Sequence, residues 1–369
     1  MPLHALEWRL VVVPLVPAAL IGSTRVVERE YLSVTAQDGD GASGSAYAFT
    51  RGLPLLELLE PIAREALAAG GDPDLFAERV HRRFRFAGLA SVVERVRSLV
   101  DLALWDLRGH LAGEPVWRLL GGSGEPLDVV SVVGYVREGD PPDAWLAELD
   151  AAEPLGRLAT KMMGGSSAAE DAARARGALA GRAAGTPVWL DVHGAWTPGA
   201  EAEAGLRELE AAGVSLVEEP FAASTPVEAL TGLRAAAGVE VAAGEVESDP
   251  RVLVAFADAG VDVLRLDATV LGGVGGFLAA ARQIGERGRP VFPHFYPEFH
   301  AALASAAPNA LAIEIVPPWT TGLAPFMRWP VEEAGGRLRP PERPGFGIEW
   351  DREALGAHTV RLGSARREG

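Results

Sequence analysis

The stretch PVWLDVHGAW, residues 187–196, changes from apolar to polar within a few residues. A short apolar run, Val188 to Leu190, is followed by Asp191 and, two positions later, by His193. Side chains two residues apart in a β-strand point to the same side, so this carboxylate and this imidazole would share one face. The stretch therefore predicts a buried strand with polar side chains at its carboxyl end.

Seven other short apolar runs follow the same pattern, and Ala-rich stretches with helical periodicity, such as residues 168–181 and 199–213, lie between them. Regular alternation of strands and helices predicts a parallel sheet, and eight such units predict an α/β fold closed into a (β/α)8 barrel. The runs are VVSVVGY (129–135), LATKM (158–162), PVWLDVH (187–193), VSLVEEP (214–220), VEVAAGE (239–245), VDVLRLD (261–267), PVFPHF (290–295) and ALAIEI (310–315).

The chain outside this alternation has a different pattern. Strand-like runs at 8–13 and 26–37 precede helical periodicity at 55–69 and 91–111, which indicates an α+β unit. The last fifty residues are rich in Pro and Gly and show no core of their own, so they are expected to pack back on the first unit. We therefore predict three segments, namely residues 1–125, the barrel at 126–320 and a returning segment at 321–369.

The composition excludes several classes of function. With 34 basic and 50 acidic residues the net charge is −16, which argues against nucleic acid or an anionic membrane as a partner. The chain has no cysteine, so thiolate chemistry is excluded and metal ligands must be oxygen or imidazole; this composition is typical of a cytoplasmic protein. The apolar run 10–21 is too short to span a membrane and contains Pro14 and Pro17, so we expect a first strand continuing into a loop.

Seven of the eight runs end in a polar residue, at intervals of 20 to 30 positions, which is enough for one strand, one helix and two loops. The carboxyl ends of all strands in a (β/α)8 barrel meet on one face, where active sites are found. We therefore expect these seven side chains to converge on one pocket. They are Lys161, Asp191, Glu218, Glu245, Asp267, His294 and Glu314.

Three consecutive strands supply Asp191, Glu218 and Glu245, and three carboxylates in one pocket raise one another's pKa unless a cation neutralises them. The sequence predicts a hard divalent cation, Mg²⁺ by preference with Mn²⁺ as the alternative. Pairing with barrel cations is the structural explanation, but Lys161 is the only lysine in the chain and Arg265 is expected to pair with one carboxylate.

The next two strands supply Asp267 and His294. A carboxylate beside an imidazole fixes its tautomer and raises its basicity, which predicts His294 as a general base. His300 falls on the helix after this strand and is expected to be a surface or packing residue.

These marks together resemble the enolase superfamily, in the subgroup of mandelate racemase and the acid-sugar dehydratases. The resemblance covers nearly the whole chain and rests on DLALWDLRGHLAGEPVWRLLGG (101–122), LDVHGAW (190–196), VEEP (217–220), AAGE (242–245), RLDATVLGG (265–273), PHF (293–295), AIE (312–314) and PERPGFGIEWD (341–351).

The resemblance implies that the α+β unit caps the barrel and that the N-terminal loops near residues 15–25 and 44–52 close over the pocket. It implies Asp191, Glu218 and Glu245 as Mg²⁺ ligands, and Asp267–His294 as the base that removes a proton α to a carboxylate. Glu314 is implied as a hydrogen-bonding or acid group. A small-molecule carboxylate substrate and a homo-oligomeric state are also implied.

Two positions differ from the commonest pattern of the family. Members with two opposed bases carry Lys-x-Lys on the second strand, whereas this chain has Lys161 and Met163. Either Met163 replaces the second lysine or Lys161 is itself the opposing base, and the spacing to Asp191 leaves both registers open.

The second difference is His193, where racemase-like members often have Asn. The sugar-acid dehydratases that resemble galactonate dehydratase carry Asp-x-His-Gly, in which the histidine is a general acid; otherwise His193 is a hydrogen-bond partner of Asp191 or a rim residue. Because hydroxide leaves only when protonated, a histidine here favours dehydration of an acid sugar to a 2-keto-3-deoxy acid, with Glu314 as a further acid. The alternative is a racemase or epimerase of a 2-hydroxy acid that uses Lys161 and His294 as opposing bases.

Overall fold

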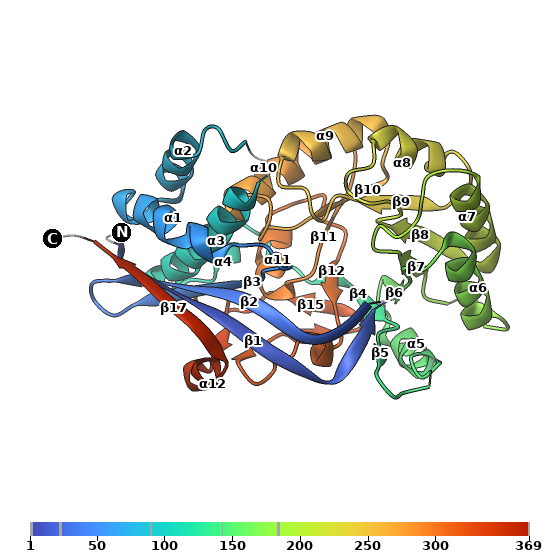
Figure 1. Cartoon of the computed structure of the whole chain (residues 1–369), viewed down its shortest axis with the longest axis horizontal. Helices are drawn as coiled ribbons and strands as arrows, with labels where there is room; N and C mark the ends of the chain where they lie inside the picture. Colours follow the sequence, from blue (N-terminus) through green and yellow to red (C-terminus); the bar gives the residue numbers. More distant parts are fainter. Residues whose placement is uncertain (1–2, 22–23, 89–90, 142, 183–184, 368–369) are drawn as a thin grey trace.

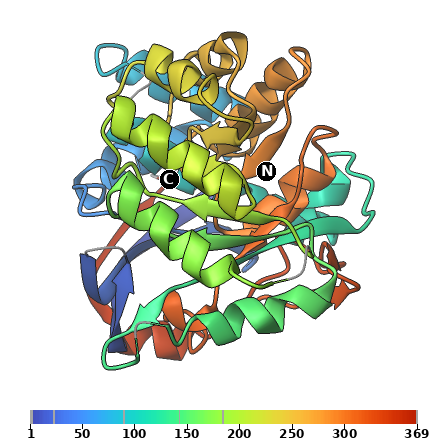
Figure 2. The same cartoon turned by 90° about the vertical axis from the view of Figure 1, so that its right-hand side faces the viewer.

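The computed structural model describes residues 3–21, 24–88, 91–141, 143–182 and 185–367. It contains an antiparallel sheet with helices packed on it and a barrel of parallel strands with helices around its outside (Figure 1). Figure 2 shows α6 and α7, in green, lying side by side on the outer surface of the barrel. In the described part of the chain, no helix combines the length and the apolarity needed to cross a bilayer.

The antiparallel sheet joins the two ends of the described chain. Its strand order is β17-β1-β2-β3, and the short β5 pairs with the far end of β1. The first strand does not end in a loop as the sequence analysis expected, because it resumes after an irregular segment between Pro14 and Ala19 and continues to Ile21. Proline has no N–H for a sheet ladder, which explains the interruption. The strands are β1 (Leu3–Ile21), β2 (Thr24–Asp38), β3 (Ser43–Phe49), β5 (Val136–Arg137) and β17 (Thr359–Arg366).

The two longest helices of the first unit pack on this sheet, and two shorter ones pack against these helices. The longest, α3 (Val92–Ala112), is mostly buried and ends at Gly113, whose left-handed backbone (φ +67°) closes the last turn. It lies so close to β3 that Gly44 has no room for a side chain, since a Cβ there would lie 1.9 Å from the backbone N of Leu107. The others are α1 (Leu56–Ala68), α2 (Pro73–Arg83) and α4 (Val116–Leu119).

The eight predicted barrel strands all form. Seven pair in parallel in the order β4-β6-β7-β8-β9-β10-β11, and β12 pairs with β4. Backbone hydrogen bonds of Val291 with Asn309 and Leu311 connect β11 to the chain entering β12 and close the ring. The strands are β4 (Leu127–Val133), β6 (Ala159–Met163), β7 (Val188–Asp191), β8 (Val214–Glu218), β9 (Glu240–Ala243), β10 (Val263–Leu266), β11 (Val291–Pro293) and β12 (Ile313–Ile315).

Helices connect successive barrel strands and cover the outer surface. After β12 the chain enters a short 3-10 turn, Pro318–Thr320, instead of an eighth helix, so the barrel is a modified one. The connecting helices are α5 (Leu146–Ala152), which leads into the 3-10 turn Glu153–Leu155, then α6 (Ala168–Leu179), α7 (Ala200–Ala212), α8 (Val227–Arg234), α9 (Pro250–Ala259), α10 (Gly273–Gly285) and α11 (Pro297–Ser305).

The barrel interior is apolar at one end and polar at the other. Eight buried side chains, one from each strand or the residue before it, form an apolar layer that includes Trp189, Leu216 and Phe292. Because side chains alternate along a strand, the next inward position, two residues later, holds Asp191, Glu218 and His294, respectively. The same two-residue step that makes the core therefore places polar groups at the barrel mouth.

The chain after the barrel packs on both units. Strand β15 pairs antiparallel with β4, and the backbone N of Phe346 donates to the buried Asp106 carboxylate on α3 (2.8 Å). Phe326 and Leu355 join the main apolar core. The remaining elements are β13 (Met327–Arg328), β14 (Glu332–Ala334), β15 (Arg337–Arg339), β16 (Glu349–Trp350) and α12 (Arg352–Ala357).

The contact at Gly44 gives a test of how the sheet is positioned. Gly44→Ala is expected to lower the free energy of unfolding by about 3 kcal/mol or more, because the added methyl group overlaps the α3 backbone. Gly39→Ala is the matched control, since a Cβ there meets nothing within 4 Å. Urea unfolding measures both variants, and equal stability of the two would contradict the close approach of β3 and α3.

Candidate active site

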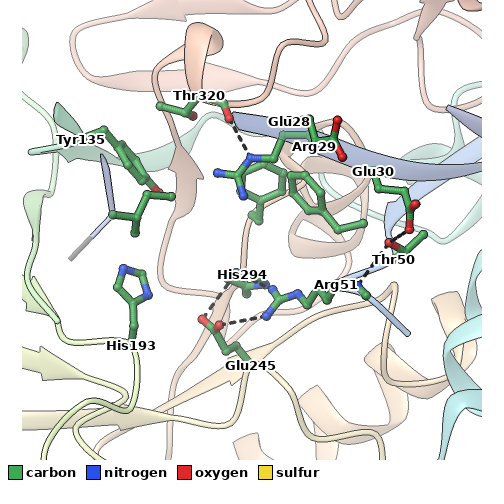
Figure 3. Close-up of a pocket in the computed structure, with 14 residues that line it drawn as sticks. Glu28, Arg29, Glu30, Thr50, Arg51, Tyr135, His193, Glu245, His294 and Thr320 are labelled. Carbon is green, nitrogen blue, oxygen red and sulfur yellow. Dashed lines mark hydrogen bonds and ion pairs between the residues drawn. The ribbon is translucent and has the colours of Figure 1, made fainter. Parts of the chain in front are cut away.

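A cavity of about 520 Å³ lies between the antiparallel sheet and the barrel mouth (Figure 3). Barrel side chains at its base include His193, Glu245 and His294. The opposite wall comes from β2 and from the turn after β3, including Arg29 and Arg51. The segments 15–25 and 44–52 were expected to approach the pocket. Of these, Ile21 and residues 49–52 line the cavity, and residues 22–23 lie outside the described residues.

His294 and Asp267 form the predicted pair. Each follows directly after its strand, and the Nδ1 of His294 lies 3.0 Å from Oδ2 of Asp267. The other oxygen, Oδ1, accepts hydrogen bonds from the backbone N and the hydroxyl of Thr269, both at 2.7 Å. Although burial acts in the opposite direction, hydrogen bonding and charge from His294 lower the pKa of Asp267 to about 2. The imidazole is therefore held by an ionised carboxylate, with Nε2 on its other side.

The three predicted metal ligands lie at neighbouring strand ends. Asp191 and Glu218 are the last residues of β7 and β8, pair with each other across the ladder, and are 3% and 0% exposed. Glu245 lies two residues beyond β9 and turns toward the cavity wall, with Oε1 3.6 Å from Arg51 and Oε2 3.4 Å from Nε2 of His294. All three carboxylates thus lie at the barrel mouth, as the sequence predicts. Asp191 and Glu218 share their contacts, whereas Glu245 contacts Arg51 and His294.

Protein cations neutralise more of this charge than the sequence analysis expected. The Nζ of Lys161 lies 3.2 Å from Asp191 and 2.6 Å from Glu218. Lys161 also contacts Glu314, and Arg265 binds both Glu218 (3.1 Å) and Glu314 (2.8 Å) instead of a single carboxylate. Pairing with Lys161 and Arg265 therefore explains part of this carboxylate cluster without a metal ion.

One oxygen of the cluster has no hydrogen-bond partner among the described residues. The Oε2 atom of Glu218 is buried and makes no hydrogen bond, whereas its Oε1 contacts Lys161 and Arg265. Burial raises the pKa of Glu218 well above its usual range, in spite of those two cations. For Asp191 burial is outweighed by His193 and Lys161, which lower its pKa to about 2.

The donor set fits a hard cation by its chemistry. In the described residues, no three His, Asp or Glu side chains converge closely enough to hold a metal ion as they stand. The three strand-end carboxylates are nevertheless oxygen donors, and Oε2 of Glu218 is a buried acceptor that receives no hydrogen bond from any described residue. Asp191, Glu218 and Glu245 are therefore the residues that would hold a divalent cation.

The pairing of β6 and β7 settles the register of the second strand. Met163 lies opposite Asp191, at the level of the strand-end carboxylates, and Lys161 lies one layer deeper, opposite Trp189. Lys161 is 1% exposed and is absent from the residues that line the cavity. The position level with the carboxylates is thus occupied by a thioether, which is no base.

His193 reaches the cavity through an unusual backbone conformation. Its φ is +51°, its backbone N donates to Oδ1 of Asp191 (3.0 Å), and its ring Nδ1 lies 3.4 Å from the same oxygen. The side chain is one-third exposed and lines the cavity. The structure thus places His193 both beside Asp191 and at the edge of the site.

Residues with strained backbone conformations are concentrated at this site. All the described non-glycine residues with positive φ either line the cavity or adjoin a residue of the site. Such conformations cost about 1–3 kcal/mol each and persist where the surrounding structure enforces them. They are Arg51, His193, Glu219, Phe295 and Tyr296.

Two cavity arginines were not identified from the sequence. Arg51, in the turn after β3, places Nη2 3.5 Å from Nε2 of His294, so the capping unit directly contacts the predicted base. Arg29 on β2 faces the same cavity. Neither residue is part of a repeated pattern, although the change from Phe49 through Thr50 to Arg51 and Gly52 marks a turn.

His300 is a packing residue and is not on the surface. It is 0% exposed, its Nδ1 lies 2.6 Å from the carbonyl oxygen of Phe295, and its Nε2 accepts from the backbone N of Ala268 (3.0 Å). These bonds connect the chain after His294 with the chain after Asp267.

The mouth of the parallel barrel carries carboxylates and a His–Asp pair beneath an antiparallel cap. This arrangement defines a class of capped-barrel enzymes. Residues 147–354 match the family described as enolase C-terminal domain-like. The chain belongs to the enolase superfamily and is homologous to its acid-sugar dehydratases, which confirms the resemblance and the fold expected from the sequence.

Individual relatives support this assignment. The chain is 30% identical over 285 residues to a D-galactonate dehydratase of Ralstonia pickettii, covering 69% of this chain and 71% of the relative. A mandelate racemase/muconate lactonizing enzyme-like protein from Rubrobacter xylanophilus superposes with a TM-score of 0.87 at 26% identity, covering 98% and 100% of the two chains. An L-talarate dehydratase from Polaromonas sp. JS666, solved with Mg and L-glucarate, has a TM-score of 0.82 at 22% identity and 99% coverage of both chains.

Removal of single carboxylates tests the cation site. Asp191→Asn and Glu218→Gln are each expected to weaken Mg²⁺ binding, measured by titration calorimetry, by on the order of 100-fold, because each removes an anionic oxygen donor. Glu208→Gln, an exposed carboxylate on α7 paired with Arg176, is the control and should bind Mg²⁺ normally. Unchanged affinity in Asp191→Asn would contradict the three-carboxylate site.

Proposed function

We propose that this protein abstracts the proton α to the carboxylate of an acid sugar and eliminates the β-hydroxyl, giving a 2-keto-3-deoxy acid. The observation that carries the proposal is the presence of two histidines on one cavity, one held by a carboxylate and the other at the rim. Homology to acid-sugar dehydratases supports the same reaction class.

His294 is the proposed base. Its Nδ1 faces the ionised Asp267, which fixes the tautomer with the proton on Nδ1 and leaves Nε2 to accept the C2 proton. Arg51 and Glu245 both contact Nε2 in this structure. The C2–H group of the substrate must therefore take their place beside this atom. Glu314 accepts from the backbone N of Phe295 (2.6 Å) and thereby fixes the chain directly after the base. A positioning role for Glu314 fits these contacts better than that of a second acid, since it is buried against Lys161 and Arg265.

Asp191, Glu218 and Glu245 are the proposed ligands of Mg²⁺. An α-proton is only weakly acidic, and a bound divalent cation supplies charge stabilisation for the carboxylate oxygens as the proton leaves. The task of Lys161 and Arg265 is to hold Glu218 and Glu314 in place beneath these ligands. The Mg-containing structure of the talarate dehydratase relative agrees with this choice of cation.

His193 is the proposed general acid. As the C2 proton moves to His294, the electron pair left at C2 forms the C2–C3 double bond and the C3–oxygen bond breaks. His193 donates a proton to the departing hydroxyl, which leaves as water, and the resulting enol becomes the 2-keto product by taking a proton at C3 and releasing the proton of its C2 hydroxyl. The one-third exposed imidazole, which lines the cavity next to Asp191, can be protonated again from solvent.

The racemase alternative needs a second base on the opposite side of the substrate. Lys161 was the candidate, but it is surrounded by three buried carboxylates and does not line the cavity. Met163 occupies the level at which such a base would act. These contacts favour elimination over inversion at C2.

Substitution of each histidine should separate abstraction of the C2 proton from loss of the hydroxyl. His193→Asn is expected to reduce formation of 2-keto acid by about 10²–10⁴-fold while exchange of the C2 proton with solvent deuterium continues, because only the leaving group loses its acid. His294→Asn should abolish both signals. Semicarbazide detection and proton NMR in D₂O with an acid-sugar panel and Mg²⁺ measure them.

The exposed His4 on β1 supplies the control for these variants, and His4→Asn should retain both activities. Dehydration by His193→Asn at the wild-type rate would refute the acid assignment. Deuterium incorporation at C2 by the wild-type protein without any keto product would instead establish the racemase reaction.

A further inference from the structure

The wall of the cavity opposite the barrel contains a cation whose terminal nitrogens donate no hydrogen bond to any residue that the structure describes. Arg29 extends from β2 into the cavity and is half-buried. Its Nε donates to the carbonyl oxygen of Thr320 (3.1 Å), and its guanidinium carbon lies 5.2 Å from the centre of the Phe49 ring. These two contacts fix the plane of the guanidinium and leave its terminal Nη1 and Nη2 groups pointing away from the Nε side.

Arg29 has no counter-ion among the described residues, since no carboxylate of that part of the chain lies within 4 Å of it. Glu28 and Glu30 also line the cavity, but Glu30 is bound by the hydroxyl of Thr50, and Figure 3 shows both carboxylates directed away from the guanidinium of Arg29. A half-buried guanidinium that lacks an anionic partner is a ready site for a carboxylate, which it binds through two parallel N–H···O bonds.

The second cavity arginine has a different position. Arg51 already contacts Glu245 and His294 at the base of the cavity, where the reacting end of the substrate belongs. Arg29 lies on the capping sheet, across the cavity from His193. Arg51 is therefore already paired with groups of the barrel mouth, whereas Arg29 has no such contact among the described residues.

We infer that Arg29 binds a second carboxylate, at the far end of the substrate, so that the substrates are acid sugars with a carboxylate at both ends. This inference rests on the proposed function, which places the first carboxylate at the barrel mouth. It makes Arg29 a specificity-determining residue that discriminates diacids from monoacids. A sugar acid that ends in a hydroxyl would leave the guanidinium without an anion and would bind more weakly.

The test compares paired substrates. Six-carbon sugar diacids and the monoacids of matching configuration are assayed with wild type and with Arg29→Met, which keeps an unbranched side chain as far as the position of Nε and removes the charged end. For diacids the variant should raise KM by about 10- to 150-fold, the effect of a lost charged hydrogen-bond pair, while kcat changes less than about threefold. For monoacids KM should stay unchanged.

Arg25→Met is the matched control. Arg25 lies on the same strand, is exposed, pairs with Glu138 and does not line the cavity, so its variant should keep wild-type kinetics with both substrate classes. Thermal unfolding of both variants checks that the sheet is intact. Arg29→Lys should recover only part of the diacid affinity, because an ammonium cannot bind a carboxylate in the same two-bond geometry.

A binding measurement separates failure of this inference from failure of the proposed reaction. His294→Asn, which lacks the base, is titrated with diacids and monoacids in the presence of Mg²⁺, with and without Arg29→Met. Tighter binding of diacids that disappears with Arg29→Met supports the inference, even when no acid is turned over and the proposed reaction therefore fails. Equal binding of the two classes, equal weakening of both by Arg29→Met, or turnover of monoacids but not of diacids would overturn it.

Discussion

The site depends on a charge balance inside the barrel. Lys161, the only lysine in the chain, and Arg265 lie at its centre, both almost fully buried, and together they contact Asp191, Glu218 and Glu314. Burying so many ionised groups is costly unless each is paired, because removal of one partner leaves an uncompensated charge in a medium of low polarity. The two cations thus allow the acidic residues to occupy the barrel mouth without unfolding it, and they fix the direction of each carboxylate.

Much of this arrangement was predictable because it follows from strand geometry. The two-residue alternation that makes Trp189, Leu216 and Phe292 an apolar layer also predicts where Asp191, Glu218 and His294 lie. Parallel pairing then brings residues from distant parts of the sequence to one edge. All eight strands and the polar residues that end seven of them were found in this way.

The rest depends on contacts between units, for which one sequence contains no periodic signal. Arg29 lies on β2 and Arg51 in the turn after β3, and only the structure shows that both line the cavity at the barrel mouth. The register of Lys161 could be read only from its pairing with β7, since a shift of two residues keeps the same inward face. The continuation of β1 beyond Pro14 was not predicted for a related reason, because two prolines interrupt a ladder without ending the strand.

The sheet that carries Arg29 is completed by residues from both ends of the described chain. Strand β17, Thr359–Arg366, forms the edge next to β1 and pairs with Ala5 to Val11. During synthesis the barrel strands leave the ribosome before this partner does, so the barrel can close while the first strand still has an unpaired edge. Pairings over such a sequence distance form slowly, and an unpaired edge is open to other chains. The sheet that forms this wall of the cavity is therefore completed by β17 only after all the barrel strands have been made.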